Sequence, residues 1–181
     1  MNGREILIGV TGGIAAYKTA ALVSKLVQAG ANVSVAMTPA SQQFIGKATF
    51  AALTGRRVAT EVFDDSSHPL GAHISLAERA DLFCIAPATA NFMAKAAHGS
   101  ADDLLSTLYL AFPGTTIIAP SMNCDMWEKP TVQRNLQQLR DDGVKIVDTE
   151  EGWLSCRKKG LGRMADPETI LQAIRHELRD Q

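Results

Sequence analysis

Short apolar runs recur along the chain and alternate with stretches of helical periodicity. Five runs have the length and composition of strands: residues 5–10, 32–37, 81–87, 115–120 and 144–148. Between the first two runs, small or apolar residues recur at helical spacing over 14–29: Ala15, Thr19, Leu22 and Leu26. Gly30 ends this predicted helix. Strands that are apolar on both faces and separated by helices indicate a parallel, doubly wound sheet.

The rest of the chain fits the same alternation. Pro39 and Ser41 open a second helical stretch, residues 131–142 form an amphipathic segment, and Pro167 opens a C-terminal helix. Two segments are predicted to lack regular structure. They are residues 55–71 and a loop, after the fifth strand, that contains Gly152, Gly160 and Gly162. With no repeat and no clear linker, the sequence predicts one three-layer αβα domain over residues 1–181. Its doubly wound parallel sheet would be of the Rossmann-like or flavodoxin-like kind.

The composition excludes several classes of partner. The chain is 46% hydrophobic and 20% charged with a net charge of -1, so it carries no basic footprint for nucleic acid. No apolar run approaches the roughly 20 residues of a membrane span, and no signal peptide is expected at the N-terminus. The cysteines at 84, 124 and 156 are odd in number and form no CxxC pair. They predict reduced thiols in a cytoplasmic protein, with neither disulfides nor a metal site.

Small, hydroxyl-bearing and amide residues follow four of the predicted strands. These turns are residues 11–13, 38–39, 87–91 and 120–123. Such residues are common caps of helices, which accounts for any one turn alone. Ligands of doubly wound sheets bind beyond the carboxyl ends of the strands, where all four turns would meet. The sequence therefore predicts a ligand site at this edge.

The first turn, GVTGGIAAYKT, narrows the choice of ligand. Tyr17 stands where a P-loop needs glycine, and the GxGxxG dinucleotide fingerprint lacks its third glycine. The second strand also ends without an acidic residue for a ribose hydroxyl, which disfavours NAD. A phosphate at the helix start remains reasonable, and one phosphate with a flat ring indicates FMN. The predicted cofactor-binding residues are Gly12, Gly13, Ile14, Thr38, Thr89, Ala90, Asn91, Phe92 and Ser121.

Five motifs together resemble the flavin-dependent cysteine decarboxylases. They are TGGIAAYK, HISLAERAD, APATAN, PSMNCDMW and SCRKKGLGRM, and the resemblance runs from Ile6 to Ala173. PSMNCDMW matches the family pattern PxMNxxMW in full. APATAN departs from PASANT, since Thr89 replaces serine and Phe92 replaces the last threonine. Within the family, the pattern is most similar to the decarboxylases that convert 4′-phosphopantothenoylcysteine to 4′-phosphopantetheine in coenzyme A biosynthesis.

The resemblance implies a reaction that needs a flavin. Loss of CO2 from an N-acylated cysteine leaves a carbanion that nothing delocalises, and the amide nitrogen cannot form a Schiff base. Hydride transfer from the carbon bearing the thiol to FMN gives a thioaldehyde, which allows CO2 to leave and an enethiolate to form. Return of the hydride, with protonation of the other carbon, gives the saturated aminothiol.

The resemblance also implies roles for four residues. His73 is similar to the family's catalytic histidine, although a histidine near a helix start would otherwise be unremarkable. Asn123 is similar to the residue that holds the substrate carboxylate, and it could equally be a turn residue. Met126 would contact substrate or flavin, and Cys156 is similar to the acid that protonates carbon in the reductive half. The basic residues around Cys156 could attract a phosphorylated substrate or be solvated: Arg157, Lys158, Lys159 and Arg163.

Two alternative functions remain at this point. One is a related enzyme of the same fold, either a peptidyl-cysteine decarboxylase or a flavin prenyltransferase. The other is a non-catalytic flavin-binding regulatory subunit, and the presence of both His73 and Cys156 argues against it. The family further implies a homotrimer, or a multiple of trimers, with His73 supplied by the neighbouring subunit. A ligase that makes the substrate is expected as a partner or as a fused domain.

Overall fold

The computed structural model describes residues 1–63 and 71–179. Its main sheet has five parallel strands in the order β2-β1-β3-β4-β5. The strands are β1 (Glu5–Val10), β2 (Asn32–Met37), β3 (Leu82–Ala88), β4 (Thr115–Pro120) and β5 (Lys145–Ile146). This order is that of a flavodoxin-like doubly wound sheet, whose strand order reverses beside β1. The predicted fold class is therefore confirmed.

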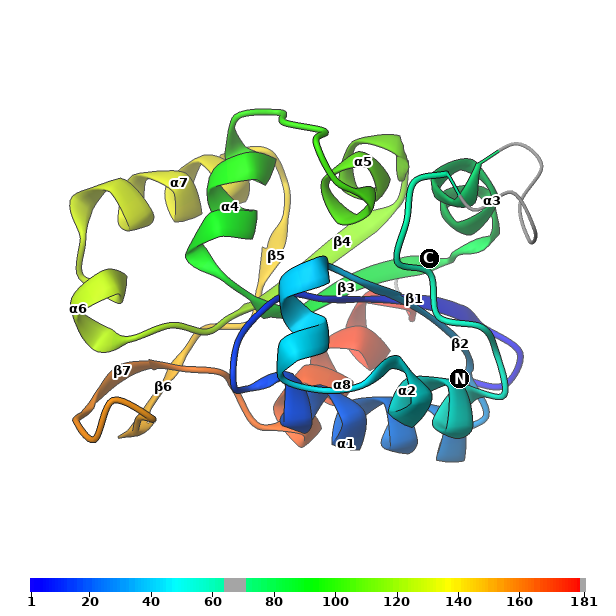
Figure 1. Cartoon of the computed structure of the whole chain (residues 1–181), viewed down its shortest axis with the longest axis horizontal. Helices are drawn as coiled ribbons and strands as arrows, with labels where there is room; N and C mark the ends of the chain where they lie inside the picture. The colour runs from blue at the N-terminus through cyan, green and yellow to red at the C-terminus, as the bar shows by residue number, and fades with distance from the viewer. Residues whose placement is uncertain (64–70, 180–181) are drawn as a thin grey trace.

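Helices cover both faces of the sheet (Figure 1). On one face lie α1 (Ala16–Gln28), α2 (Lys47–Thr54) and α8 (Pro167–Glu177). On the other lie α3 (Ala72–Arg79), α4 (Ala90–Ala97), α5 (Leu104–Ala111) and α7 (Pro130–Asp141). Two short elements complete the set, the 3-10 helix η1 (Pro39–Gln43) and α6 (Cys124–Trp127). The sheet and its two layers of helices form the predicted three-layer arrangement.

Each face of the sheet has its own hydrophobic core. Alternate residues of β1 point to opposite faces, so Ile6 and Ile8 pack against α1 and α8, whereas Leu7 packs against the α3–α5 side. The residues of β3 are buried along its whole length, because this strand lies in the middle of the sheet. Full burial here raises the pKa of the Cys84 thiol to about 12. Cys84 is therefore a core residue, as its place in an apolar strand predicts.

Several expectations about local structure need correction. The glycine-punctuated loop after the fifth strand is instead an antiparallel hairpin of β6 (Glu150–Trp153) and β7 (Lys159–Arg163). Its glycines hid the strand signal, because glycine is rare in strands. The fifth parallel strand is only two residues long, and η1 precedes α2 in the second helical stretch. Residues 64–70 of the segment predicted to be irregular lie outside the described residues.

Two other kinds of site, a membrane span and a metal centre, are absent from the described residues. No helix within the described residues is long and apolar enough to cross a membrane. Across the same ranges, 1–63 and 71–179, histidine, cysteine and acidic side chains form no group that could hold a metal ion. All three cysteines are free thiols.

Candidate functional site

A cavity of about 940 Å³ lies beyond the carboxyl ends of the parallel strands. Its lining comes from the turns after β1, β2, β3 and β4, and from the hairpin of β6 and β7. All predicted cofactor-binding and substrate-binding residues line it, together with Cys156: Gly12, Gly13, Ile14, Thr38, Thr89, Ala90, Asn91, Phe92, Ser121, Asn123 and Met126. The structure thus brings residues from four separate turns and the hairpin into one site.

A buried hydroxyl joins the two central turns of this wall. The Thr11 side chain donates a hydrogen bond to the Pro87 carbonyl at 2.6 Å, and its Oγ1 accepts one from the Thr89 amide at 3.0 Å. Thr19, also buried, donates to the Ala86 carbonyl at 2.6 Å. Buried polar groups satisfied in this way fix local geometry, because breaking them leaves unpaired groups in the core. The turns after β1 and β3 are therefore held together as one rigid unit.

Gly12 allows the turn after β1 to approach the turn after β2. A Cβ atom at this position would lie 2.6 Å from the Cβ of Ala40 and 3.0 Å from its carbonyl carbon. Any side chain would force the two turns apart. The close approach brings the turn that precedes α1 against the turn after β2, and backbone amides at the start of a helix favour an anion.

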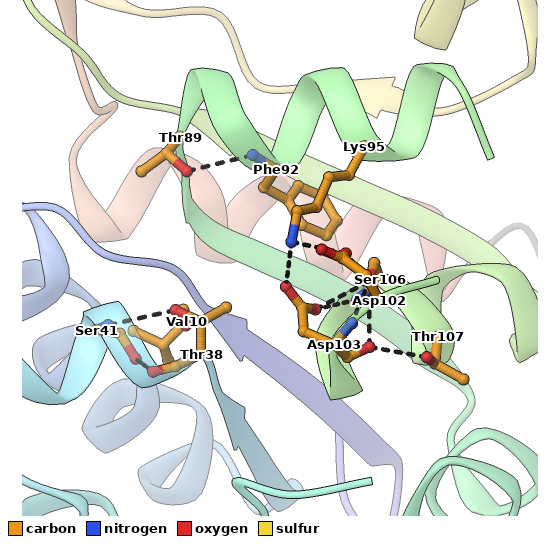
Figure 2. Close-up of polar contacts among 10 residues, drawn as sticks. All are labelled: Val10, Thr38, Ser41, Thr89, Phe92, Lys95, Asp102, Asp103, Ser106 and Thr107. Atoms are coloured by element: carbon orange, nitrogen blue, oxygen red, sulfur yellow. Dashed lines mark hydrogen bonds and ion pairs between the residues drawn. The ribbon is translucent and has the colours of Figure 1, made fainter. Parts of the chain in front are cut away.

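Hydroxyl groups cap two of the helices that start at the cavity (Figure 2). Thr38 Oγ1 accepts from the Ser41 amide at 3.3 Å, which starts η1, and Thr89 Oγ1 accepts from the Phe92 amide at 3.4 Å, which starts α4. N-caps satisfy amides that would otherwise lack partners. The same hydroxyls line the cavity, so the capping role and a ligand-binding role are compatible.

An ionic cluster that the sequence pattern does not mark also lines the cavity. Lys95 Nζ lies 2.7 Å from carboxylate oxygens of both Asp102 and Asp103, and the Ser106 amide donates to Asp103 at 2.8 Å (Figure 2). Burial opposes the charge of Lys95, but the hydrogen bonds to the two carboxylates raise its pKa overall. Burial likewise opposes ionisation of Asp103, yet hydrogen bonds from Lys95 and Ser106 lower its pKa. Both residues line the cavity as charged groups.

Asn123 has the conformation of a helix N-cap. Its Oδ1 accepts from the Asp125 amide at 2.7 Å and the Met126 amide at 3.4 Å, which starts α6. Within the described part of the chain, its Nδ2 donates no hydrogen bond. The turn role and the substrate role therefore use different atoms, because Nδ2 is free to donate to a carboxylate. Met126 is about half exposed at the same rim.

Cys156 lies at the tip of the β6–β7 hairpin and is exposed. The Arg157 amide donates to the Leu154 carbonyl at 2.9 Å, and the Leu154 amide donates to the Lys158 carbonyl at 2.9 Å. Arg157 has a φ of 63°, in the left-handed region. This pattern is a three-residue hairpin loop with a bulge. It carries the Cys156 thiol to the cavity, which Ser155 also lines, while Arg157 turns the chain back.

Other residues that line the cavity were not predicted from the sequence, because nothing in their local pattern marks them. Three are aromatic residues at least half exposed at the rim: Tyr17, Phe44 and Trp153. Lys18 is buried and also lines the cavity. Of the basic residues around Cys156, Arg163 lines the cavity, and the other three do not. The helical pattern of α1 predicts that Tyr17 is exposed. It does not predict that Tyr17 lines the cavity, because the hairpin that forms part of the lining is distant in sequence.

His73 is the one predicted site residue outside the cavity lining. It lies in the first turn of α3, one residue after the helix starts. Its Nδ1 is buried and has no hydrogen-bond partner among the described residues. Gly71, with a φ of 94°, packs closely against the His73 ring, since a Cβ there would lie 3.2 Å from Nδ1. Within this chain, His73 is therefore separate from the cavity that Asn123 and Cys156 line.

Comparison with known proteins agrees with this geometry. The Flavoprotein family model matches residues 1–179. The chain is 45% identical over 172 residues to the coenzyme A biosynthesis bifunctional protein CoaBC of Bacillus subtilis (strain 168). This match covers 95% of the chain and 42% of that relative, so the chain spans less than half the length of the curated protein.

Two solved structures are similar over nearly their whole length. The FMN-dependent cysteine decarboxylase SpaF is 37% identical with a TM-score of 0.84, covering 98% of this chain and 96% of SpaF. A PPC decarboxylase mutant complexed with pantothenoylaminoethenethiol is 27% identical with a TM-score of 0.86, covering 98% and 100%. These findings confirm the resemblance to flavin-dependent cysteine decarboxylases that the motifs indicated, and the chain belongs to the Flavoprotein family.

Proposed function

We propose that this domain, residues 1–181, binds FMN and decarboxylates 4′-phosphopantothenoylcysteine to 4′-phosphopantetheine, a step of coenzyme A biosynthesis. The observation that carries the proposal is the position of Asn123 and Cys156 on the same cavity as the predicted flavin-binding turns. The relatives support it. The bifunctional CoaBC protein acts in coenzyme A biosynthesis, and the PPC decarboxylase was captured with pantothenoylaminoethenethiol.

The residues of the cavity fit FMN. Gly13 and Ile14 lie in the turn just before α1, and the hydroxyls of Thr38 and Thr89 lie on neighbouring turns, a donor set suited to one phosphate. Gly12 lets the turns after β1 and β2 lie close together, because a Cβ there would clash with Ala40. At about 940 Å³ the cavity is at the upper end of the roughly 300–1,000 Å³ of small-molecule sites. That volume accommodates a cofactor and part of a substrate together.

The chain's own residues would then handle the substrate and its protons. Bound FMN would supply a hydride acceptor for the carbon bearing the thiol, and later a hydride donor. Asn123 Nδ2 would hold the carboxylate by a neutral hydrogen bond, which does not stabilise the carboxylate as strongly as a cation would. The thiol of Cys156 would protonate the carbon next to the nitrogen in the second half. Met126 would shield the substrate from water at the rim.

The position of His73 supports a shared active site. His73 lies away from the cavity of its own subunit, and exposed aromatic side chains surround the cavity mouth, among them Tyr17 and Phe44. A homotrimer, or a multiple of trimers, would cover these residues and supply His73 from the neighbouring subunit. Sedimentation and mixed-subunit experiments test this arrangement. His73→Asn and Cys156→Ser proteins, each defective in forming the saturated thiol, should regain that activity when mixed and reassembled. A stable, active monomer would contradict it.

A peptidyl-cysteine decarboxylase is the main competing function. SpaF, an FMN-dependent cysteine decarboxylase, is similar over almost the whole chain. Cys156 favours the phosphopantothenoylcysteine reaction, because a peptide enethiol product needs no carbon acid. Neither a flavin prenyltransferase nor a regulatory subunit would need Asn123 and Cys156 at one cavity.

A direct experiment separates these functions. The purified protein should be yellow with noncovalent FMN and should convert 4′-phosphopantothenoylcysteine to CO2 and a saturated thiol, as mass spectrometry would show. A colourless protein that takes up no FMN would refute the proposal. Release of CO2 from a cysteine-ended peptide alone would favour the competing function.

A ligase, separate or fused, would supply the substrate, and the free cysteines agree with a cytoplasmic location.

A further inference from the structure

Lys18 is a buried cation that links two distant parts of the chain. Its side chain is 9% exposed, and it lies in the first turns of α1, beside the turn after β1. Its Nζ donates to the Met164 carbonyl at 2.9 Å and lies 2.7 Å from Asp166 Oδ1. Both partners belong to the segment between β7 and α8, about 150 residues further along the chain. A cation is seldom buried to this extent without a structural or functional reason.

The carboxylate that Lys18 contacts lies at the base of the hairpin. Asp166 Oδ1 also accepts from Arg163 at 3.1 Å, the last residue of β7. The Asp166 amide donates to the Glu150 side chain at 3.0 Å, and Glu150 is the first residue of β6. Lys18 and Asp166 therefore connect α1 to both strands of the hairpin that carries Cys156.

The ion pair near the hairpin tip is more exposed, while the buried Leu154 side chain and a backbone hydrogen bond also hold the hairpin. Near the tip, Lys158 and Asp125 form an ion pair of 2.7 Å, but their side chains are 57% and 63% exposed. Exposed pairs contribute little to stability. Midway along β7, the Met122 amide donates to the Gly162 carbonyl at 2.9 Å. Among the described residues, Lys18 alone contacts the hairpin through a buried charged side chain, which must keep its partners.

We propose that Lys18 is a positioning residue that fastens the base of the β6–β7 hairpin and thereby places Cys156 at the cavity. Without Lys18, the Met164 carbonyl loses its donor and Asp166 loses its buried partner. The hairpin then pivots away from the α1 wall. That Lys18 fastens the hairpin does not depend on what the protein does. Its consequence for protonation by Cys156 rests on the proposed function.

The chain provides a matched control for this contact. Lys25 lies two turns after Lys18 on α1, and its Nζ forms a 3.0 Å ion pair with Glu168 on α8. Both side chains are about half exposed. Lys25→Met removes an α1–α8 ion pair without touching the base of the hairpin. Lys18→Met removes the same kind of group from the buried site.

Limited trypsin digestion under native conditions tests the fastening directly. Three consecutive trypsin sites lie in and beside the hairpin loop, at Arg157, Lys158 and Lys159. Lys18→Met should raise cleavage there about tenfold, because a hydrogen bond to a charged group shifts an opening equilibrium by about that factor. Cleavage elsewhere should not change. Lys25→Met should leave the hairpin as resistant as in the wild type.

Two results would overturn the proposal. One is equal cleavage of the hairpin loop in Lys18→Met and Lys25→Met. The other is a uniform rise across all sites, which would indicate general destabilisation. If Lys18→Met does not fold, Asp166→Asn replaces it, since it removes the ion pair and leaves the Lys18–Met164 bond. Unchanged cleavage of the hairpin in that variant would equally overturn the proposal.

Product analysis connects the fastening to the chemistry. If both proposals hold, Lys18→Met should still release CO2 but accumulate the enethiol, because the displaced thiol of Cys156 protonates carbon slowly. Rescue by Lys18→Arg, which restores a cation with several donors, would support the positioning role. Changed cleavage without any decarboxylation in the wild type would refute the function and leave the fastening intact. These two failures are thus distinguishable.

Discussion

The wall of turns after β1 and β3 and the hairpin of β6 and β7 face each other across one cavity, but they are built differently. The wall is held by buried hydrogen bonds, such as that from Thr11 to the Pro87 carbonyl. The hairpin has an exposed tip that carries Cys156, and its contact with a buried charge, Lys18, lies at its base. The wall of turns is therefore part of the hydrophobic core, whereas the hairpin is a separate element that packs against it.

The difference matches what each side would have to do. A cofactor that stays bound through many turnovers needs donors that do not move, and preorganised turns provide them. A substrate must enter and leave, so the groups that act on it benefit from an element that can open. We expect changes in the wall to affect stability and flavin binding, and changes in the hairpin to affect turnover.

The largest effect should come from a residue on neither side. His73→Asn should retain FMN yet release CO2 at least about a hundredfold more slowly, because a positioned general acid or base contributes roughly 10²–10⁴-fold. CO2 release from substrate and the visible flavin spectrum measure the two properties. His98→Asn is the control, because His98 is exposed at the end of α4 and outside the cavity. Undiminished CO2 release by His73→Asn would remove His73 from the mechanism.

The next largest effect separates the hairpin from the wall. Cys156→Ser should bind FMN normally and release CO2, but it should form the saturated thiol at least about a hundredfold more slowly. A serine hydroxyl is a much weaker acid than a thiol, so the enethiol should accumulate and the visible flavin absorbance should not recover. Mass spectrometry of the products, with absorbance followed in parallel, measures both.

Cys124→Ser is the matched control for Cys156→Ser. Cys124 lies beside the hairpin, since a Cβ at Gly160 would be 3.1 Å from its Cβ, but it does not line the cavity. This control should form the saturated thiol at the normal rate. If Cys156→Ser did so too, another residue would be the proton donor.

The two sides also differed in how far the sequence could predict them. The wall follows from local rules: apolar runs end in glycine, threonine and proline, and the topology of a doubly wound sheet brings those turns together. That reasoning predicted the fold, and it predicted that Gly12, Thr38 and Thr89 lie at one edge of the sheet, where they line the cavity. The hairpin was predicted to be a loop, because its strands contain three glycines and pair only with each other.

Residues that act through long-range contacts were the ones missed. Lys18 meets Met164 and Asp166 across the fold, and no periodicity in α1 marks it as buried. Lys95 and Asp103 form their pair between two helices. His73 was proposed only from the resemblance to a family, since its position on α3 is outside the cavity lining. No local pattern in the sequence marks a residue that lies away from the cavity.

A smaller effect, on stability, should come from the wall. Thr11→Val keeps the shape of the side chain and removes its hydroxyl, so the Pro87 carbonyl and the Thr89 amide lose a buried partner. The free energy of unfolding should fall by about 2 kcal/mol, the usual cost of unsatisfied buried groups. Urea denaturation measures it, and Thr11→Ser, which keeps the hydroxyl, should lose less. Equal losses in the two variants would mean that the methyl group, rather than the hydrogen bonds, stabilises the wall.

The smallest effect should be a local stabilisation of the hairpin. Arg157 has a φ of 63°, a conformation that costs non-glycine residues about 1 kcal/mol and glycine almost nothing. Arg157→Gly should therefore close the hairpin more firmly, by up to about 1 kcal/mol. Because the hairpin is a sheet separate from the main one, we expect it to open locally. Amide hydrogen exchange over Glu150–Arg163 is therefore the suitable measurement, and the rest of the chain should exchange as in the wild type. Lys158→Gly is the control, since Lys158 does not have a positive φ and a glycine there should loosen the hairpin. Faster exchange in Arg157→Gly would show that the Arg157 side chain holds the hairpin closed more than its backbone strains it.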